Sequence, residues 1–593
     1  MARINQASQD LLRYNAAILP SVRSSFDKSH SHTTTCDSGY IIPLDWDRVL
    51  PGDEKKIRYS GLARMATPLH PVMDEAKFDV FAFFVPDRLW WSHAKEFYGE
   101  NLDASFNPDG QYVMPYLVPS QYWVDPVKSP SDNGLQSLSD YLGFPLGKHD
   151  VAITAWDGCT DLRCSAGLHR SYQIIYNEYF RNSSVQPALR LSTGDNVTGD
   201  EWKVISQLRL ACKFPDMFTT LLKEPQAGND VTLPLGDWAP VVTRSENVNL
   251  NSFDPNSSSD PIISHLRHIM LDNNADEQAG RYDASLTGDL FGHSYYPGLY
   301  NGQATAYATD ARLNSNAVVP ANLWTNLTDA SAVTINNLRA AVTVQHLLEI
   351  DALAGKRYQN ILAMHFNVFT PDGTVQRPEL LGVCRQTVGM KQVLQTSASE
   401  ADSPQGNTAA FSVTNISNEW ICNKAFTEPG FIMVLGVIRP VQSYSQGIDP
   451  LLTKLNRYDH YWPVFDNLGN QPMPVSALYC TNLNNDSPSD VSERVMGYSE
   501  AWIEYRMRPN RVSGLMRPDI PAGSVHNSLA SWNYSTFYSE PQYLTPDFVE
   551  EDPTLIDRTI AIPNEPQFII DSYFDYSDTK NMSVHSVPGL LRL

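Results

Sequence analysis

The segment KFDVFAFFVP, residues 77–86, decides the fold class because it is apolar on both faces of an extended chain. Successive side chains of a β-strand point to opposite sides. The two faces would carry Phe81, Phe83 and Val85 on one side, and Phe78, Val80, Ala82 and Phe84 on the other. A strand that is apolar on both faces is covered on both faces. The sequence therefore predicts a central strand in a layered β structure.

Other strand signals lie on either side of this segment. GYIIPLDWDRVL (39–50) reads as a strand that ends at Pro51 and Gly52, which fit the two central positions of a type II turn. In KIRYS (56–60), Ile57 and Tyr59 alternate with polar residues, as in a half-buried strand. FIMVLGVIRP (431–440) and EAWIEYRMRP (500–509) are predicted as further strands. The region from Pro518 to Leu593 is rich in proline and is expected to be mostly irregular.

Two helices are predicted in the middle of the chain. Leu168, Tyr172, Ile175 and Tyr179 recur at helical spacing. A second helix is predicted within 334–355, where Thr334 can cap the N-terminus and Gly355 the C-terminus. Between the helices, residues 237–333 are rich in Asn, Ser, Asp and Gly and have weak periodicity, which indicates a large excursion from the core.

Composition limits the classes of function. The chain of 593 residues has 44 basic and 66 acidic side chains, a net charge of −22. Neutralising phosphates requires clustered cations, so a chain this acidic is not by itself a general nucleic-acid binder. Its apolar runs are far shorter than the ~18 residues of a membrane span, and no secretory signal is visible. The 7 cysteines form no C-x-x-C pair and are expected to be reduced thiols of a chain made in a cytoplasm.

Motifs for catalysis and ligand binding are incomplete. GFPLGKH (143–149) lacks the spacing and the Ser or Thr of a phosphate loop. DNNADEQAGRYD (272–283) lacks the glycine and the final glutamate of a calcium loop. Glu550 and Glu551 are adjacent, so on an extended chain they would point to different sides. We expect no catalytic residues, cofactor or metal, although a distant pair of acids as in glycosidases leaves no local signature.

The stretch SFDKSHSHTTTCDSG (25–39) raises the question of a metal site. His30, His32 and Cys36 stand at even offsets, so on a strand they would share one side. A structural zinc site normally needs four ligands, and no fourth is nearby. The alternative is that the histidines form hydrogen bonds with neighbouring chain, with Asp27 available as a partner.

Several long blocks, in order along nearly the whole chain, resemble the major capsid protein of the Microviridae, small single-stranded-DNA bacteriophages, and of the gokushovirus type in particular. They include SFDKSHSHTTTCDSGYIIPLDWDRVLPGD (25–53), RMATPLHPVMDEAKFDVFAFFVPDRLWW (64–91), TINNLRAAVTVQHLLEIDALAGKRYQNILAMHF (334–366) and GYSEAWIEYRMRPNRVSG (497–514). The structural signature carried over by the resemblance consists of Phe26, Asp27, His30, His32, Pro51, Gly52 and Asp53. The ending LLRL and the segment 237–333 depart from the family pattern.

The resemblance implies an all-β fold: a single eight-stranded viral jelly roll with very large inter-strand loops, a few helices and an irregular C-terminal region. It implies an N-terminal arm (1–35), a jelly-roll capsid domain with insertions (36–593), and a variable insertion (237–333) that forms an exterior protrusion. Tyr295, Tyr296 and Tyr300 are the candidates for contacts where three protrusions meet at a threefold axis. His30 and His32 would have a structural role and bind no metal.

The function implied is that of a virion protein, assembled in the bacterial host cytoplasm. Sixty copies would form a T=1 icosahedral shell around a circular single-stranded DNA genome. The implied partners are other copies of the chain, the DNA, a small basic DNA-binding protein, a minor pilot protein and a host surface receptor. The residues that contact DNA are not predicted. The alternative, suggested by the acidic and aromatic-rich composition alone, is a β-sandwich carbohydrate-binding or carbohydrate-active protein.

Overall fold

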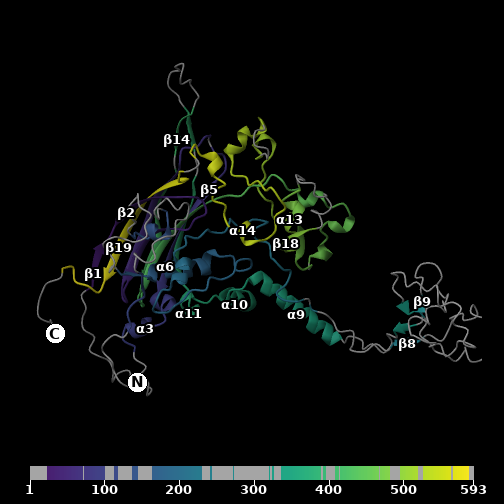
Figure 1. The fold of residues 1–593 in the computed structure, drawn as a ribbon, viewed down its shortest axis with the longest axis horizontal. Helices are drawn as coiled ribbons and strands as arrows, with labels where there is room; N and C mark the ends of the chain where they lie inside the picture. Colours follow the sequence, from purple (N-terminus) through teal and green to yellow (C-terminus); the bar gives the residue numbers. More distant parts are fainter. Residues whose placement is uncertain are drawn as a thin grey trace, which may run out of the picture. The chain divides into compact units, whose positions relative to one another are not determined.

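The computed structural model describes residues 23–70, 72–100, 112–117, 136–144, 163–229, 231, 241–243, 271–272, 319–320, 323–325, 335–388, 391–394, 408–412, 414–466, 468–480, 494–518, 525–562 and 565–585. The chain divides into two compact units. One contains residues 1–227 and 348–593, and the other contains residues 228–347. Most of the regular structure described is antiparallel β-sheet, with few helices (Figure 1).

Two sheets form the centre of the larger unit. The first has the order β1-β19-β4-β15, with β2 also paired to β19; the second has the order β12-β5-β16-β3. The strands of the first sheet are β1 Ser24–Asp27, β2 His30–Cys36, β4 Glu54–Met65, β15 Thr414–Ala425 and β19 Phe568–Lys580. Those of the second are β3 Ile42–Val49, β5 Ala76–Pro86, β12 Glu379–Val388 and β16 Gly430–Pro440.

The remaining elements are short, apart from α9. The helices are α2 Asp87–Trp90, α3 Ala94–Phe97, α5 Leu138–Tyr141, α6 Gly167–Ile175, the π-helix η1 Tyr176–Phe180, α7 Gly199–Ile205, α9 Ile335–Ala354, α10 Tyr358–Phe366, α11 Asp372–Val375, α13 Ile503–Arg506 and α14 Pro546–Val549, with 3-10 turns η7 Pro450–Leu452, η8 Arg457–Asp459, η9 Pro463–Phe465, η10 Val475–Ala477, η11 Gly514–Met516, η12 Val525–Trp532 and η13 Asp557–Thr559. The minor strands are β6 Tyr116–Leu117, β7 Cys164–Ser165, β8 Val241–Thr243, β9 Leu271–Asp272, β10 Val319–Pro320, β11 Leu323–Thr325, β13 Lys391–Leu394, β14 Thr408–Ser412, β17 Gln471–Pro474 and β18 Val495–Ser499.

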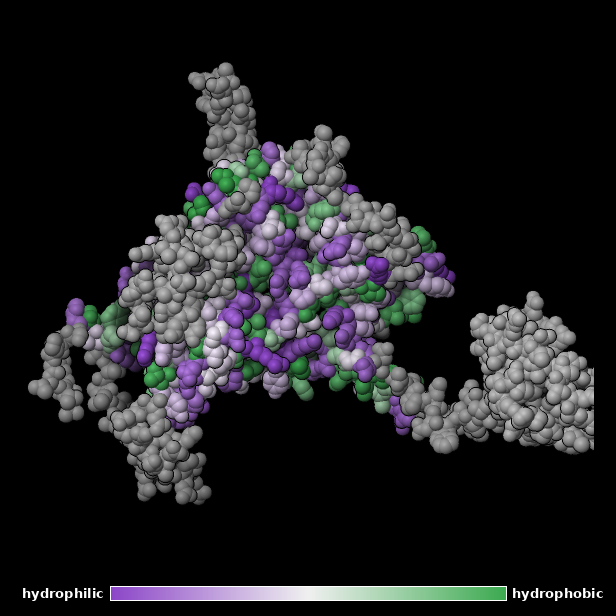
Figure 2. Space-filling model, in the orientation of Figure 1, coloured by the Kyte–Doolittle hydropathy of each residue, from purple (hydrophilic) through white to green (hydrophobic). Residues whose placement is uncertain are grey.

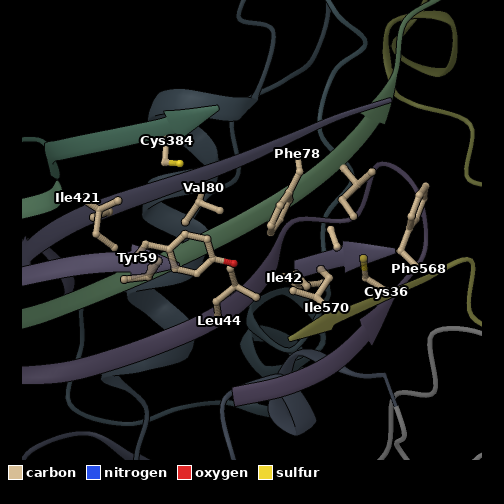
Figure 3. Packing of buried hydrophobic residues seen from close by; sticks show 14 of the residues in the cluster. Cys36, Ile42, Leu44, Tyr59, Phe78, Val80, Cys384, Ile421, Phe568 and Ile570 are labelled. Atoms are coloured by element: carbon tan, nitrogen blue, oxygen red, sulfur yellow. The ribbon is translucent and has the colours of Figure 1, made fainter. Parts of the chain in front are cut away.

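The main core lies between the two sheets. Tyr59 of the first sheet and Phe78 of the second pack edge to face, with ring centroids 6.4 Å apart (Figure 3). Cys36 is 1% exposed and belongs to the same cluster as Ile570. The predicted inward positions Ile57 and Tyr59 are fully buried, which confirms the alternation expected for this strand.

The strand β5 is covered on both faces, as its sequence predicted. Phe78, Val80, Ala82 and Phe84 belong to the core between the sheets, whereas Phe83 and Val85 belong to a second cluster. Helix α6 supplies the other side of that second cluster with Leu168, Tyr172 and Ile175. The predicted helix is therefore confirmed, and its apolar stripe is what covers the outer face of the second sheet.

The sheets approach each other closely between β12 and β15. A Cβ atom at Gly382 would lie 2.5 Å from the carbonyl oxygen of Ile421, so only glycine fits without moving one strand. The predicted turn after β3 also holds. The amide of Asp53 donates to the carbonyl of Leu50 at 3.1 Å, and Gly52 has a φ of +90°.

One sequence prediction is wrong, and the structure adds detail to two others. Part of the predicted N-terminal arm (1–35) joins the first sheet, because residues 24–27 and 30–36 both pair with β19. Residues 500–509 were expected to form a strand, which is wrong: Trp502 adopts a left-handed conformation with φ of +67° and starts the short helix α13. The C-terminal region, expected to be mostly irregular, also contains β19, thirteen residues long, which lies inside the first sheet between β4 and β1. Figure 1 shows β19 beside β1 and β2.

Candidate assembly site

Most of the signature residues lie along β19 or near its C-terminal end. Phe26 pairs with Asp578, and His30 pairs with Phe574. The carbonyl of Gly52 accepts a hydrogen bond from Arg23 Nη2 at 3.0 Å, and Asp53 forms an ion pair with Lys580 at 2.8 Å. Residues that are more than 500 positions apart in the sequence therefore meet at one end of the β-sandwich.

Asp27 shapes the short break between β1 and β2. Its Oδ1 accepts hydrogen bonds from the Ser29 amide at 2.9 Å and from Ser29 Oγ at 2.5 Å. Ser29 Oγ in turn accepts from the amide of Tyr576 at 3.1 Å, which replaces a ladder hydrogen bond. The hydrogen bond from Ser29 lowers the pKa of Asp27. Asp27 thus holds the chain in register across the break, whereas His30 contacts Lys28 and Asp45.

His30 links the two sheets. Its ring stacks on Phe574 with centroids 5.2 Å apart, and its Nδ1 lies 2.8 Å from the carbonyl oxygen of Lys28. The Nε2 atom lies 3.2 Å from Oδ1 of Asp45, which is on β3 of the second sheet. The hydrogen bond to Asp45 raises the pKa of His30 to about 9, against the effect of partial burial. At neutral pH the pair is therefore ionic.

The other two residues considered as metal ligands, His32 and Cys36, do not join His30 in a common site. His32 lies opposite Ser572, and its Nδ1 is buried without a hydrogen bond to the described residues. Cys36 is buried in the apolar core. Within the residues that the structure describes, no group of three or more His, Cys, Asp or Glu side chains is arranged to hold a metal ion.

A charged network, here called the seam cluster, lies next to the signature residues and consists of Lys28, Asp47, Lys55, Tyr576 and Asp578. Lys55 and Asp578 are fully buried, and the Lys55 Nζ lies 3.1 Å from Asp578 Oδ2. Lys55 also pairs with Asp47, and the Tyr576 hydroxyl donates to Asp47 at 2.7 Å. Lys28 Nζ lies 3.0 Å from a carboxylate oxygen of each aspartate.

The seam cluster joins strands of both sheets by charge. Asp47 is on β3 in the second sheet, whereas Lys55 and Asp578 are on β4 and β19 in the first. Burial would raise the pKa of Asp47, but the ammonium group of Lys55, the hydrogen bond from Tyr576 and the ammonium group of Lys28 together outweigh this effect and lower the pKa. Sequence reasoning missed this network. The available signal was a charged residue at an inward-facing position of each strand: Lys55 in β4 and Asp578 in β19.

Large apolar side chains are exposed at several places on the larger unit (Figure 2). Helix α10 buries none of its residues; Phe366 at its end is 70% exposed, and Phe369 just beyond it is 81% exposed. A second group lies between residues 452 and 464. Exposed apolar patches of this kind mark protein or membrane contacts more often than free surface. No helix in the described part of the chain combines the length and apolar character needed to cross a membrane.

The predicted threefold residues Tyr295, Tyr296 and Tyr300 lie outside the described residues. Of the segment 237–333, the structure describes only two short strand pairs, β8 with β11 and β9 with β10.

Comparison with known proteins identifies the family to which this chain belongs. A family model described as "Capsid protein (F protein)" matches residues 17–590. Capsid protein VP1 of Spiroplasma virus 4 is 32% identical over 606 residues, covering 100% of this chain and 99% of the relative. Capsid protein VP1 of Chlamydia phage 1 is 30% identical and covers 96% of both chains. VP1 of Bdellovibrio phage phiMH2K is 30% identical, with 97% and 98% covered.

These relatives are structural capsid proteins rather than enzymes, which removes the carbohydrate-active alternative. The chain therefore belongs to the capsid protein (F protein) family of Microviridae phages and is a structural major capsid protein of the virion.

Proposed function

We propose that this chain folds as a single eight-stranded viral jelly roll and that sixty copies form a T=1 shell around a circular single-stranded DNA genome. The strand order supports the fold. β1 and β2 follow one register along β19 and count as one strand, which leaves four strands in each sheet. Along the chain, β2, β3, β4 and β5 alternate between the sheets, as do β15, β16 and β19. Two packed sheets of this kind are the jelly-roll pattern.

The proposed division into domains follows the two-sheet core. Residues 36–593 form the jelly-roll domain with its insertions, and 1–35 form an N-terminal arm of which residues 24–35 join the first sheet. Residues 237–333 are proposed as the exterior protrusion that contributes to host attachment, with Tyr295, Tyr296 and Tyr300 at a threefold contact. The separate compact unit at 228–347, which contains this segment, supports treating it as an insertion.

The mass of the native particle tests the shell. Sixty copies of a 66.4 kDa chain give a protein mass of about 4 MDa. Native mass spectrometry of purified particles is expected to show this protein mass plus the mass of the enclosed DNA, and cryo-EM is expected to show icosahedral symmetry. The enclosed DNA should resist nuclease in intact particles and yield to a single-strand-specific nuclease after disassembly. A smaller closed ring, or an open filament, would contradict the proposal.

We infer that genome packaging depends on a separate small basic protein, and that a minor pilot protein and a host receptor are further partners. A subunit with a net charge of −22 repels DNA on average. Isolated subunits are therefore expected to bind single-stranded DNA weakly at physiological salt, as measured by fluorescence anisotropy with a labelled oligonucleotide. Tight binding without a partner would contradict this division of labour.

A further inference from the structure

Two segments of the larger unit, both far in sequence from the chain termini, pack against each other. One is 450–465, with the turns η7, η8 and η9, and the other is 502–517, with α13 and η11. Lys454 pairs with Glu504, and the rings of Tyr461 and Trp502 pack edge to face with centroids 5.7 Å apart. The Tyr505 hydroxyl lies 3.3 Å from His460 Nδ1. These contacts hold the two segments as one surface.

This surface leaves large apolar side chains in solvent. Leu455 and Val464 are 86% and 87% exposed, and Tyr458 is 71% exposed. Leu452 and Leu515 are also more than half exposed. Single exposed apolar residues are ordinary, but a group on two adjoining segments is a contact surface in most proteins.

Both segments contribute to a cleft, through Pro450 and Glu504. The same cleft is lined by Arg508, Arg511 and Arg517, together with the apolar side chains of Met507 and Phe218. All three arginines are exposed. Within the described part of the chain, none of them has an acidic side chain at ion-pair distance, whereas the neighbouring Arg506 pairs with Glu500.

The acidic residues of the cleft are engaged elsewhere. Glu504 pairs with Lys454, and Asp449 Oδ1 accepts a hydrogen bond from the Leu451 amide at 3.0 Å. The cleft therefore presents an excess of positive charge in a chain whose net charge is −22. Its electrostatic complement is an acidic surface.

We propose that this arginine surface, made of Leu455, Tyr458, Val464, Arg508, Arg511 and Arg517, is a contact with a second copy of the chain, which places acidic side chains in the cleft and apolar side chains against its rim. The inference rests on the proposed assembly into a shell. Tyr, Met and Arg are enriched in protein interfaces. The exposed leucines and valine favour a protein partner over nucleic acid, because aliphatic side chains gain little from a phosphate backbone. Since the acidic partner surface differs from the arginine surface, the contact is heterologous, as shell assembly requires.

The test compares two charge-reversal triples in the full-length chain, expressed under conditions in which the wild type forms particles. One is Arg508→Glu with Arg511→Glu and Arg517→Glu. The matched control reverses three exposed basic residues elsewhere on the same unit, Arg190→Glu, Lys203→Glu and Lys223→Glu, and changes the net charge equally. Sedimentation measures the yield of particles, and thermal unfolding checks that the subunits fold. The arginine triple is expected to lower the yield by about tenfold or more with an unchanged unfolding temperature. The control triple is expected to retain the yield.

A second measurement needs no variant. Oxidative footprinting of wild-type particles should show Met507 and Tyr458 protected relative to dissociated subunits. Full reactivity of both in particles, or a normal yield from the arginine triple, would overturn the inference. The inference would also be overturned if the arginine triple formed normal particles but no longer bound a single-stranded oligonucleotide, because the surface would then bind nucleic acid. Absence of particles from the wild type would instead overturn the proposed shell.

Discussion

At the scale of single residues, His30 gives the fold a dependence on pH. Its pKa is about 9 in the folded chain and 6.5 for a free side chain. The folded state therefore holds the proton more tightly, and the stabilisation is complete below about pH 6.5 and disappears as pH rises through 9. The side chain is 43% exposed, so we expect only about 0.5–1 kcal/mol. Thermal unfolding between pH 6 and 9.5 should show a smaller loss of stability in His30→Gln than in the wild type. Equal slopes would contradict the role assigned to the pair with Asp45.

The two histidines together test the metal question. We expect His30→Ala with His32→Ala to impair assembly or particle stability, because β2 loses its contact with β3 and the half-buried ring of His32 opposite Ser572. The metal content of purified subunits, measured by mass spectrometry, should not change. Stoichiometric zinc or copper in the wild type that is lost in the double variant would show that the histidines are ligands.

Lys55 is the residue on which the seam cluster depends most. Lys55→Met would leave the fully buried Asp578 and the half-buried Asp47 with less positive charge nearby. Breaking a buried pair on one side costs about 3–5 kcal/mol, which denaturant unfolding of the subunit can measure. The matched control is Lys28→Met. Lys28 contacts the same two aspartates, but its side chain is 38% exposed. That variant should lose about 1 kcal/mol or less. Similar losses in the two variants would show that burial does not set the cost.

At the scale of elements, the contact between β12 and β15 depends on one glycine. Gly382→Ala places a methyl group against the Ile421 carbonyl, and the strands must separate. Overpacking in a tight contact costs about 1–3 kcal/mol. Gly373→Ala is the control, because a Cβ there meets nothing within 4 Å. If denaturant unfolding gives the same midpoint for both variants, the two sheets are less constrained at this edge than their geometry indicates.

Elements with local signals could be predicted from sequence, and those with distant partners could not. β5 and α6 carry their patterns within about ten residues, so both were found. β19 alternates too, but Ser572 and Asp578 occupy buried positions and interrupt the apolar pattern. Their partners, Tyr59 and Lys55, are more than 500 residues away. The left-handed conformation of Trp502 likewise has no signal in a run that reads as a strand.

At the scale of the whole molecule, the same limit applies to the candidate site. The signature block names residues that the fold brings close to β19, but their contacts with Asp45, Lys580 and Phe574 could not be predicted, because no short motif connects these residues to the block. The assembly surfaces could not be predicted, because exposure of Leu455 or Arg511 is a property of the folded chain. Only the resemblance suggests a partner for such surfaces, namely other copies of the chain.

The segment 237–333 has the composition of a solvated loop although it is about 100 residues long. Loops longer than about 15 residues without secondary structure are uncommon inside compact domains unless they are functional. Both ends adjoin blocks of the chain that resemble the family, so we expect a protrusion at the outer surface of the particle. Limited proteolysis of intact particles should cut this segment first, and antibodies against residues 252–260 should bind whole particles. Antibodies against 568–580, buried in the first sheet as β19, are the control and should bind only denatured subunits. Protection of 237–333 in intact particles, with cleavage only after disassembly, would place the segment inside the shell and assign host attachment to another surface.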